Sequence, residues 1–139
     1  AAKAVWQVEQ LRELYVTFAS SEAIGLSSIA SLVHPVGRDE DRGLGVQMNP
    51  EANQKVMAPI APGLFAQLGV KKWNELQLGS SWTPNIDRGV IALDGEREIE
   101  FREVDKVQLS LDRLGPRVID VSMALGAAAK HGIMLSNLN

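Results

Sequence analysis

Two short apolar runs joined at Asp94-Gly95 constrain this chain most, because Asp-Gly between such runs is the strongest local signal for a β-hairpin. The segment extends from Gly89 to Phe101. A three-residue connection ending at Glu96 places the large apolar side chains on one face: Ile91, Leu93, Ile99 and Phe101. The opposite face then carries Ala92, Glu98 and Glu100. A two-residue turn would mix the two faces, so the pattern favours the longer connection.

Composition limits the class of protein. A chain of 139 residues is long enough for one domain with a hydrophobic core, and its 45% apolar and 22% charged residues are typical of a globular protein. A net charge of -3 gives no electrostatic footprint for nucleic acid or an anionic membrane, so neither is an expected partner. Without cysteine there are no disulfides or thiolate metal sites, and a reducing, cytoplasmic location is expected. No apolar run approaches the roughly 18 residues of a membrane helix.

The first 35 residues predict two helices. Residues 4–19 carry apolar side chains at three- and four-residue steps, which line one helical face: Val5, Val8, Leu11, Tyr15 and Phe18. The pair Ser20-Ser21 can cap a second helix, which must end by His34 because Pro35 disfavours helical geometry in the residue before it. We therefore expect residues 1–35 to form a helical segment that packs on, or bridges to, the main domain.

Residues 36–139 predict a mainly β domain that ends in a helix. After a charged loop at 36–43, alternating apolar residues predict strands at 44–48, 64–68 and 106–112, with a further short strand at 117–119. Two prolines inside an apolar run, Pro59 and Pro62, indicate a sheet edge, a bend or a crossing between sheets.

The last helix has a clear start and stop. Asp120 is a good N-cap for a helix over 121–131, and Gly132 is placed as its left-handed C-cap. Together these elements predict an α+β fold, which is a mainly antiparallel β-sandwich with two N-terminal helices and one C-terminal helix.

Few residues suggest chemistry. His34 and His131 lie far apart without ligand spacing, so no metal site is predicted, and neither a glycine-rich phosphate loop nor a Gly-x-Ser-x-Gly elbow is present. Asp94-Gly95-Glu96 remains. The residues alone favour a plain turn with exposed carboxylates. The alternative is that the tip presents its carboxylates to a nucleotide ribose or to a metal-bound phosphate.

Three stretches together resemble a known family. They are the hairpin segment from Gly89 to Phe101, the Gly-Pro-Arg-Val-Ile-Asp-Val that begins at Gly115, and the Ala-Ala-Lys-His-Gly that ends at Gly132. Together they look like the C-terminal part of acetoin catabolism protein X, a family related to the ATP-NAD kinases. Residues 24–35 and 58–64 agree with this resemblance.

The resemblance implies a nucleotide-linked kinase of two parts. In such proteins an N-terminal α/β domain carries a Gly-Gly-Asp-Gly-Thr motif that handles phosphates, and a mostly β C-terminal domain helps to form the NAD site, often at a subunit interface. Asp94, Gly95 and Glu96 match the Asp-Gly-Glu of the related lipid-kinase families. The resemblance therefore implies that Asp94 and Glu96 are catalytic, and that Asp94 and Gly95 contact the cofactor, NAD or ATP.

This chain also departs from the family pattern. It contains neither Gly-Gly-Asp-Gly-Thr nor a Thr-Ala-Tyr-x-x-Ser stretch. Phosphoryl transfer needs positioned phosphates, metal and nucleophile together. We therefore expect the chain to be inert without an N-terminal α/β domain. The resemblance, in which the NAD site often lies at a subunit interface, also implies a homo-oligomer. A non-catalytic oligomerisation or ligand-binding module is the alternative. A lipid-kinase-type domain is a third, which the flanking sequence favours less.

Overall fold

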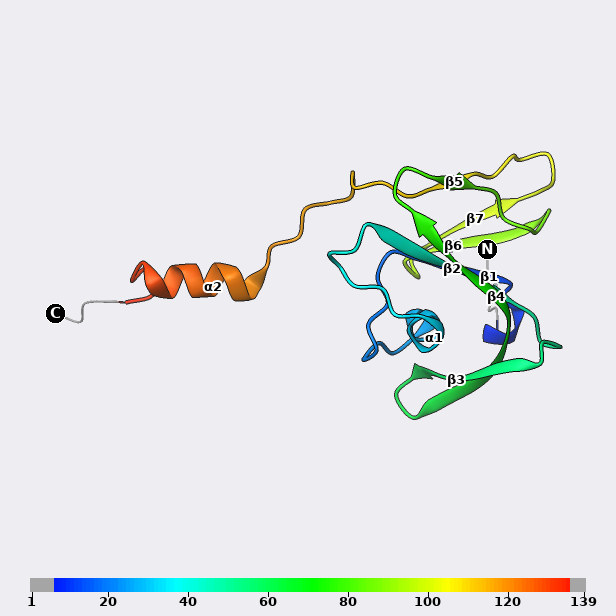
Figure 1. Ribbon diagram of the computed structural model, residues 1–139, viewed down its shortest axis with the longest axis horizontal. Helices are drawn as coiled ribbons and strands as arrows, with labels where there is room; N and C mark the ends of the chain where they lie inside the picture. The colour runs from blue at the N-terminus through cyan, green and yellow to red at the C-terminus, as the bar shows by residue number, and fades with distance from the viewer. Residues whose placement is uncertain (1–6, 136–139) are drawn as a thin grey trace.

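The computed structural model describes residues 7–135 and has an α+β fold (Figure 1). Its antiparallel main sheet has the order β1-β2-β4-β3, and two ribbons pair β5 with β8 and β6 with β7. In chain order the elements are η1 (Val8–Gln10), β1 (Glu13–Val16), α1 (Leu26–Val33), β2 (Arg42–Met48), β3 (Gln54–Ala61), β4 (Leu64–Gln77), β5 (Ser81–Trp82), β6 (Gly89–Leu93), β7 (Arg97–Phe101), β8 (Leu109–Ser110) and α2 (Val121–Lys130). The α+β class and the antiparallel pairing are as predicted, whereas a β-sandwich is not confirmed.

Strand β4 is the longest strand and connects the two halves of the main sheet. Its first half pairs with β3 and its second half with β2. Strand β3 is an edge strand, and Pro59 lies in it. Because proline has no N–H to donate, the edge is where a sheet tolerates it. Of the three interpretations of Pro59, the structure supports the edge.

Helix α1 covers one face of the main sheet. Ile29 and Ala30 of this helix are fully buried, and they pack against a cluster from the strands: Leu44, Val46, Met48, Ala58, Leu68 and Val70. Burial of these side chains is the main force that holds α1 on the sheet, because each large apolar side chain removed from water contributes about 1.5–3 kcal/mol.

The opposite face is covered in part by the segments around the ribbons. Leu76 of β4 and Leu111 beside β8 are buried there, and both side chains lie next to Gly43 of β2. A Cβ atom at Gly43 would lie 2.8 Å from the carbonyl oxygen of Val16, which is closer than real Cβ atoms approach. Strand β2 is therefore buried on both faces, and not on one face alone as its alternation predicts.

The helix predicted over residues 4–19 is wrong in the described part of that range. Residues 8–10 form a single 3-10 turn, and 13–16 form strand β1, which pairs with β2. Leu14 and Val16 alternate with Glu13 and Tyr15, and β-branched and aromatic residues suit a strand that can pair. Tertiary pairing thus outweighs the helical spacing. Residues 4–6 lie outside the described residues.

The second predicted helix exists but begins later. Helix α1 starts after Gly25, whose φ of 98° lies in the left-handed region, and it ends at His34 as expected from Pro35. The Ser20 hydroxyl instead accepts a hydrogen bond of 3.3 Å from the N–H of Glu22 in a local turn. The predicted serine cap is therefore wrong.

The C-terminal part combines a correct helix with overestimated strands. The strand predicted over 106–112 is reduced to Leu109–Ser110, and residues 117–119 form no strand. Asp120 caps α2 by accepting a hydrogen bond from the N–H of Met123, as predicted. Gly132, with a φ of 64°, takes the predicted left-handed position after the helix. Helix α2 extends away from the rest of the chain on an extended connection (Figure 1).

Candidate functional site

The predicted hairpin forms, and its tip is a tightly closed turn. Ile91 pairs with Ile99 and Leu93 with Arg97, which leaves a three-residue connection as predicted. The N–H of Glu96 donates a 3.1 Å hydrogen bond to the carbonyl oxygen of Leu93. This pairing also puts the predicted apolar side chains on one face of the ribbon.

Both central residues of the turn have a positive φ. The values are 51° for Asp94 and 71° for Gly95, as a type I′ turn requires. Asp94 is the one non-glycine residue with a positive φ in residues 7–135. Aspartate and glycine tolerate this conformation better than most residues. The residue types at the turn therefore match the backbone conformation that the tip adopts.

The tip is exposed and carries two carboxylates. Asp94, Gly95 and Glu96 are all solvent-exposed, and within the described part of the chain neither carboxylate takes part in a hydrogen bond or an ion pair. An added Cβ at Gly95 would meet nothing within 4 Å, so the space beside the turn is open. The structure thus brings the three predicted site residues together, and their roles stay predictions.

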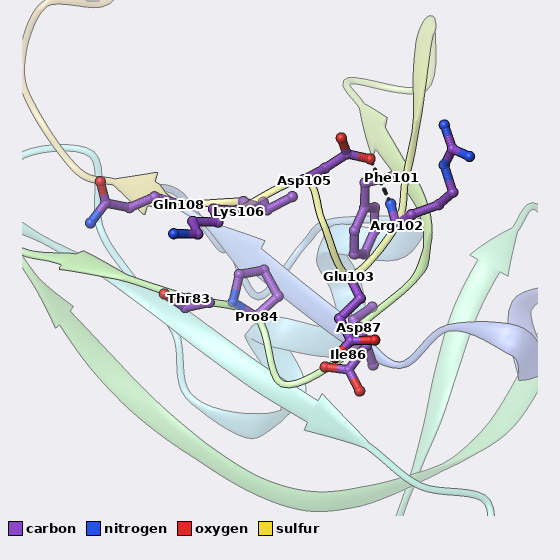
Figure 2. A pocket seen from close by; sticks show the side chains of 11 residues that line it. Thr83, Pro84, Ile86, Asp87, Phe101, Arg102, Glu103, Asp105, Lys106 and Gln108 are labelled. Atoms are coloured by element: carbon purple, nitrogen blue, oxygen red, sulfur yellow. Dashed lines mark hydrogen bonds between the residues drawn. The ribbon is translucent and has the colours of Figure 1, made fainter.

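A hollow of about 470 Å³ lies beside the base of the hairpin and does not include the tip (Figure 2). Buried Phe101 lies against it, and the segment after β7 forms much of its rim. There the carboxylate of Asp105 accepts a 2.8 Å hydrogen bond from the N–H of Arg102, while the Arg102 guanidinium points away from the hollow. The carboxylates of Asp87 and Glu103 lie at one end of it.

A second polar cluster surrounds Arg42 at the start of β2. Its guanidinium donates to the carboxylates of Glu40 and Glu75, and its Nη1 lies 2.7 Å from Nε2 of His34. Arginine has no acceptor, so His34 Nε2 accepts this hydrogen bond and a neutral ring carries its proton on Nδ1. Nε2 also lies 3.2 Å from the Glu75 carboxylate.

The cluster shifts the pKa values of two groups. The hydrogen bond from Arg42, assisted by the N–H of Gly37, lowers the pKa of Glu40 below its ordinary value. The hydrogen bond to Glu40, with the nearby charge of Glu75, raises the pKa of Arg42. Both effects favour the charged forms. Because the Arg42 guanidinium already donates to the two carboxylates, it is a poor site for a bound anion.

Sequence reasoning missed the contacts around His34. Its ring stacks on Trp73 with centroids 4.6 Å apart and planes inclined by 14°. Trp73 and Glu75 alternate with Asn74 and Leu76 along the second half of β4, and they lie on the face that also carries Val46 of β2. That alternation was the available signal, but the charged and polar residues around it hid the strand.

Two features of residues 7–135 concern metal ions and membranes. No group of three or more histidine, aspartate or glutamate side chains is arranged to hold a metal ion. No helix has the length and apolar character needed to cross a membrane.

Comparison with known proteins places the chain in a family. Residues 1–114 match the family model for the acetoin catabolism protein X C-terminal domain. The chain belongs to this family. It is also 42% identical over 137 residues to the acetoin catabolism protein X of Cupriavidus necator. No solved structure matches the chain.

The two matches differ in extent. The match to the Cupriavidus relative covers 97% of this chain, so it includes α2, whereas the match to the family model ends at residue 114, before that helix. The same match covers 38% of the relative, so the chain spans well under half the length of that acetoin catabolism protein X.

Proposed function

We propose that this chain acts as the C-terminal domain of a longer protein of the acetoin catabolism protein X type, and that its hairpin tip completes a nucleotide site there. The observation that carries this proposal is the closed turn at Asp94 and Gly95, which holds two carboxylates at an exposed, open tip. The 38% coverage of the relative supports a further domain in such proteins, for which the resemblance suggests an N-terminal α/β region.

The proposed chemistry divides between the two regions. NAD or ATP would be bound mainly by the N-terminal region, which would supply the phosphate cradle. Asp94 and Glu96 would orient a ribose hydroxyl or accept its proton, and Gly95 leaves room for the nucleotide beside the turn. On this proposal the chain alone is catalytically inert, because positioned phosphates and nucleophile must come together for phosphoryl transfer.

The test compares variants of the longer protein encoded by the full reading frame. Asp94→Asn and Glu96→Gln keep the size of each side chain and remove its charge. We expect each to lower turnover of NAD phosphorylation by about 100-fold or more, with an unchanged melting temperature. Glu98→Gln is the matched control, because Glu98 is an exposed carboxylate two residues further along.

Two results would overturn the proposal. Full turnover by both tip variants would reduce the hairpin to a structural turn. NAD phosphorylation by the purified 139-residue chain would disprove its inertness. Calorimetric titration of that chain with ATP and with NAD gives a second readout, for which we expect no binding heat.

A non-catalytic oligomerisation module is the second candidate. Val90 and Ile99 on the hairpin are about half exposed, and the apolar residues 133–135 after α2 are exposed as well. Exposed apolar surface of this kind suits a protein–protein contact. Light scattering during size-exclusion chromatography would show a homo-oligomer directly. A homo-oligomer, together with full turnover by the tip variants, would favour this second candidate.

A further inference from the structure

The final segment of the chain lies outside the folded body. Leu111 is the last buried residue of the described chain, and every residue from Asp112 to Ala127 is exposed. The elements that form the sheet and its two covering layers therefore end near residue 111. This end agrees with the match to the family model, which stops at residue 114.

Helix α2 is nevertheless well specified by its local sequence. Asp120 caps its start, and the N–H groups of Gly132 and Ile133 donate to the carbonyl oxygens of Ala129 and Ala128 at its end. This pair of bonds is the Schellman arrangement. A ten-residue helix is still marginal in water when it packs against nothing, so a stable α2 requires a partner surface.

One face of α2 is apolar and uncharged. Val121, Leu125 and Ala128 recur at four- and three-residue steps, and Val121 and Leu125 are 64% and 55% exposed. Ser122 and Lys130 lie on other parts of the helix surface. The small Ala128 allows close approach of another helix or sheet. Residues 133–135 continue the apolar surface beyond the C-cap.

The extent of the two matches bears on which region could carry that partner surface. The match to the Cupriavidus relative includes α2, whereas the match to the family's C-terminal-domain model ends at residue 114, and the chain covers only 38% of that relative. A helix that lies outside the folded body and is shared with a longer protein is best explained by packing against the rest of that protein.

We propose that α2 docks into an apolar, uncharged groove of the region that lies outside the C-terminal domain in the longer protein. The segment 112–120 acts as the strap that carries the helix there. This inference rests on the proposed function in one respect, namely that the longer protein exists. It is independent of any nucleotide chemistry at the hairpin tip.

Hydrogen exchange of the α2 amides tests the docking. We expect fast exchange over residues 121–130 in the purified 139-residue chain and at least about tenfold slower exchange in the longer protein. Leu125→Asp should abolish this protection in the longer protein. Met123→Asp is the matched control, since Met123 lies about 160° around the helix from Leu125, and it should leave the protection in place.

The isolated chain shows whether the variants damage the folded body. Because α2 contacts none of the core, Leu125→Asp should leave the melting temperature of the 139-residue chain unchanged. Three outcomes would overturn the docking: unprotected α2 amides in the longer protein, equal loss of protection in both variants, or protection in the isolated chain together with a dimer mass. The last outcome would assign α2 to a second copy. Turnover of the tip variants reports on the proposed function separately.

Discussion

The imidazole of His34 stacks on the indole of Trp73, with ring centroids 4.6 Å apart. His34 follows the last residue of α1 and Trp73 lies in β4, so this contact joins the end of the helix to the sheet. The same imidazole accepts a hydrogen bond from Arg42 of β2. One side chain thus connects three elements on the face that α1 covers.

Replacement of this ring should weaken the fold measurably. We expect His34→Ala to lower the free energy of unfolding by about 1 kcal/mol, because an aromatic pair contributes roughly 0.5–1.5 kcal/mol beyond its buried area. Urea denaturation measures the change. The control is His131→Ala at the exposed C-cap of α2, for which less than about 0.5 kcal/mol is expected. Equal effects of the two variants would show that the stack contributes nothing specific.

Gly69 is the position at which a methyl group should be least tolerated. A Cβ there would lie 1.9 Å from the carbonyl oxygen of Asn49, in a place where the Asn49 N–H also donates a 3.0 Å hydrogen bond to Gly69. The backbone must move, so Gly69→Ala should cost about 1–3 kcal/mol or more in denaturant titration. Gly115→Ala, with nothing within 4 Å, should be close to neutral. A stable Gly69→Ala variant would contradict the close contact of these two segments.

Leu111→Ala tests whether the segment beside β8 truly covers the main sheet. Leu111 is 8% exposed, and its side chain lies near Gly43 and Leu76. Its truncation should cost about 2–5 kcal/mol through lost burial and the cavity left behind. Leu114→Ala removes the same atoms from a residue that is 89% exposed, and it should change stability by less than about 0.5 kcal/mol. Similar values for the two variants would mean that this layer is detached from the sheet.

The stability of the fold should depend on Tyr15 at high pH. Partial burial, a 2.5 Å hydrogen bond to the Glu13 carboxylate and the charge of that carboxylate together raise the pKa of Tyr15 above its ordinary value. The unfolded chain loses this proton near pH 10 while the folded chain keeps it, so stability is retained below about pH 10 and falls as the pH rises further. Tyr15→Phe should remove that component of the decline.

The measurement is direct because Tyr15 is the single tyrosine of the chain. An ultraviolet absorbance titration of the folded chain should show tyrosinate forming above the ordinary pH range for tyrosine. In urea the titration should return to the ordinary range. Titration of the folded protein near pH 10 would contradict the burial of this hydroxyl beside Glu13.

Local signals allowed the hairpin and the last helix to be predicted. The Asp94-Gly95 turn and the Asp120 cap are satisfied by hydrogen bonds that span only a few residues, so a short window of sequence contains all that decides them. The tip of the candidate site was predicted for the same reason. Its chemistry was suggested by the family resemblance, and the residues themselves fix only its geometry.

Longer contacts explain what sequence reasoning missed. Val8 and Leu11 of the predicted helical face do pack against the core, from a 3-10 turn and its C-cap. In strand β1, however, Leu14 and Val16 contact the core, and the ring of the predicted Tyr15 lies beside Gly45 instead. The pairing with β2 that decides the outcome lies some thirty residues away. The contact of His34 with Glu75 spans 41 residues and could not be derived from local spacing.

Strand β4 has a consequence for how the chain reaches this fold. Its pairing with β3 closes through the tight connection at Pro62-Gly63, whereas its pairing with β2 must bring together segments as distant as Arg42 and Gln77. Closing the short loop costs less entropy, so the β3–β4 hairpin should form early. Strand β4 of this hairpin then offers the edge on which β2 pairs. Once the sheet is complete, loss of either neighbour of β4 would expose the core, so we expect the sheet to unfold in a single cooperative event.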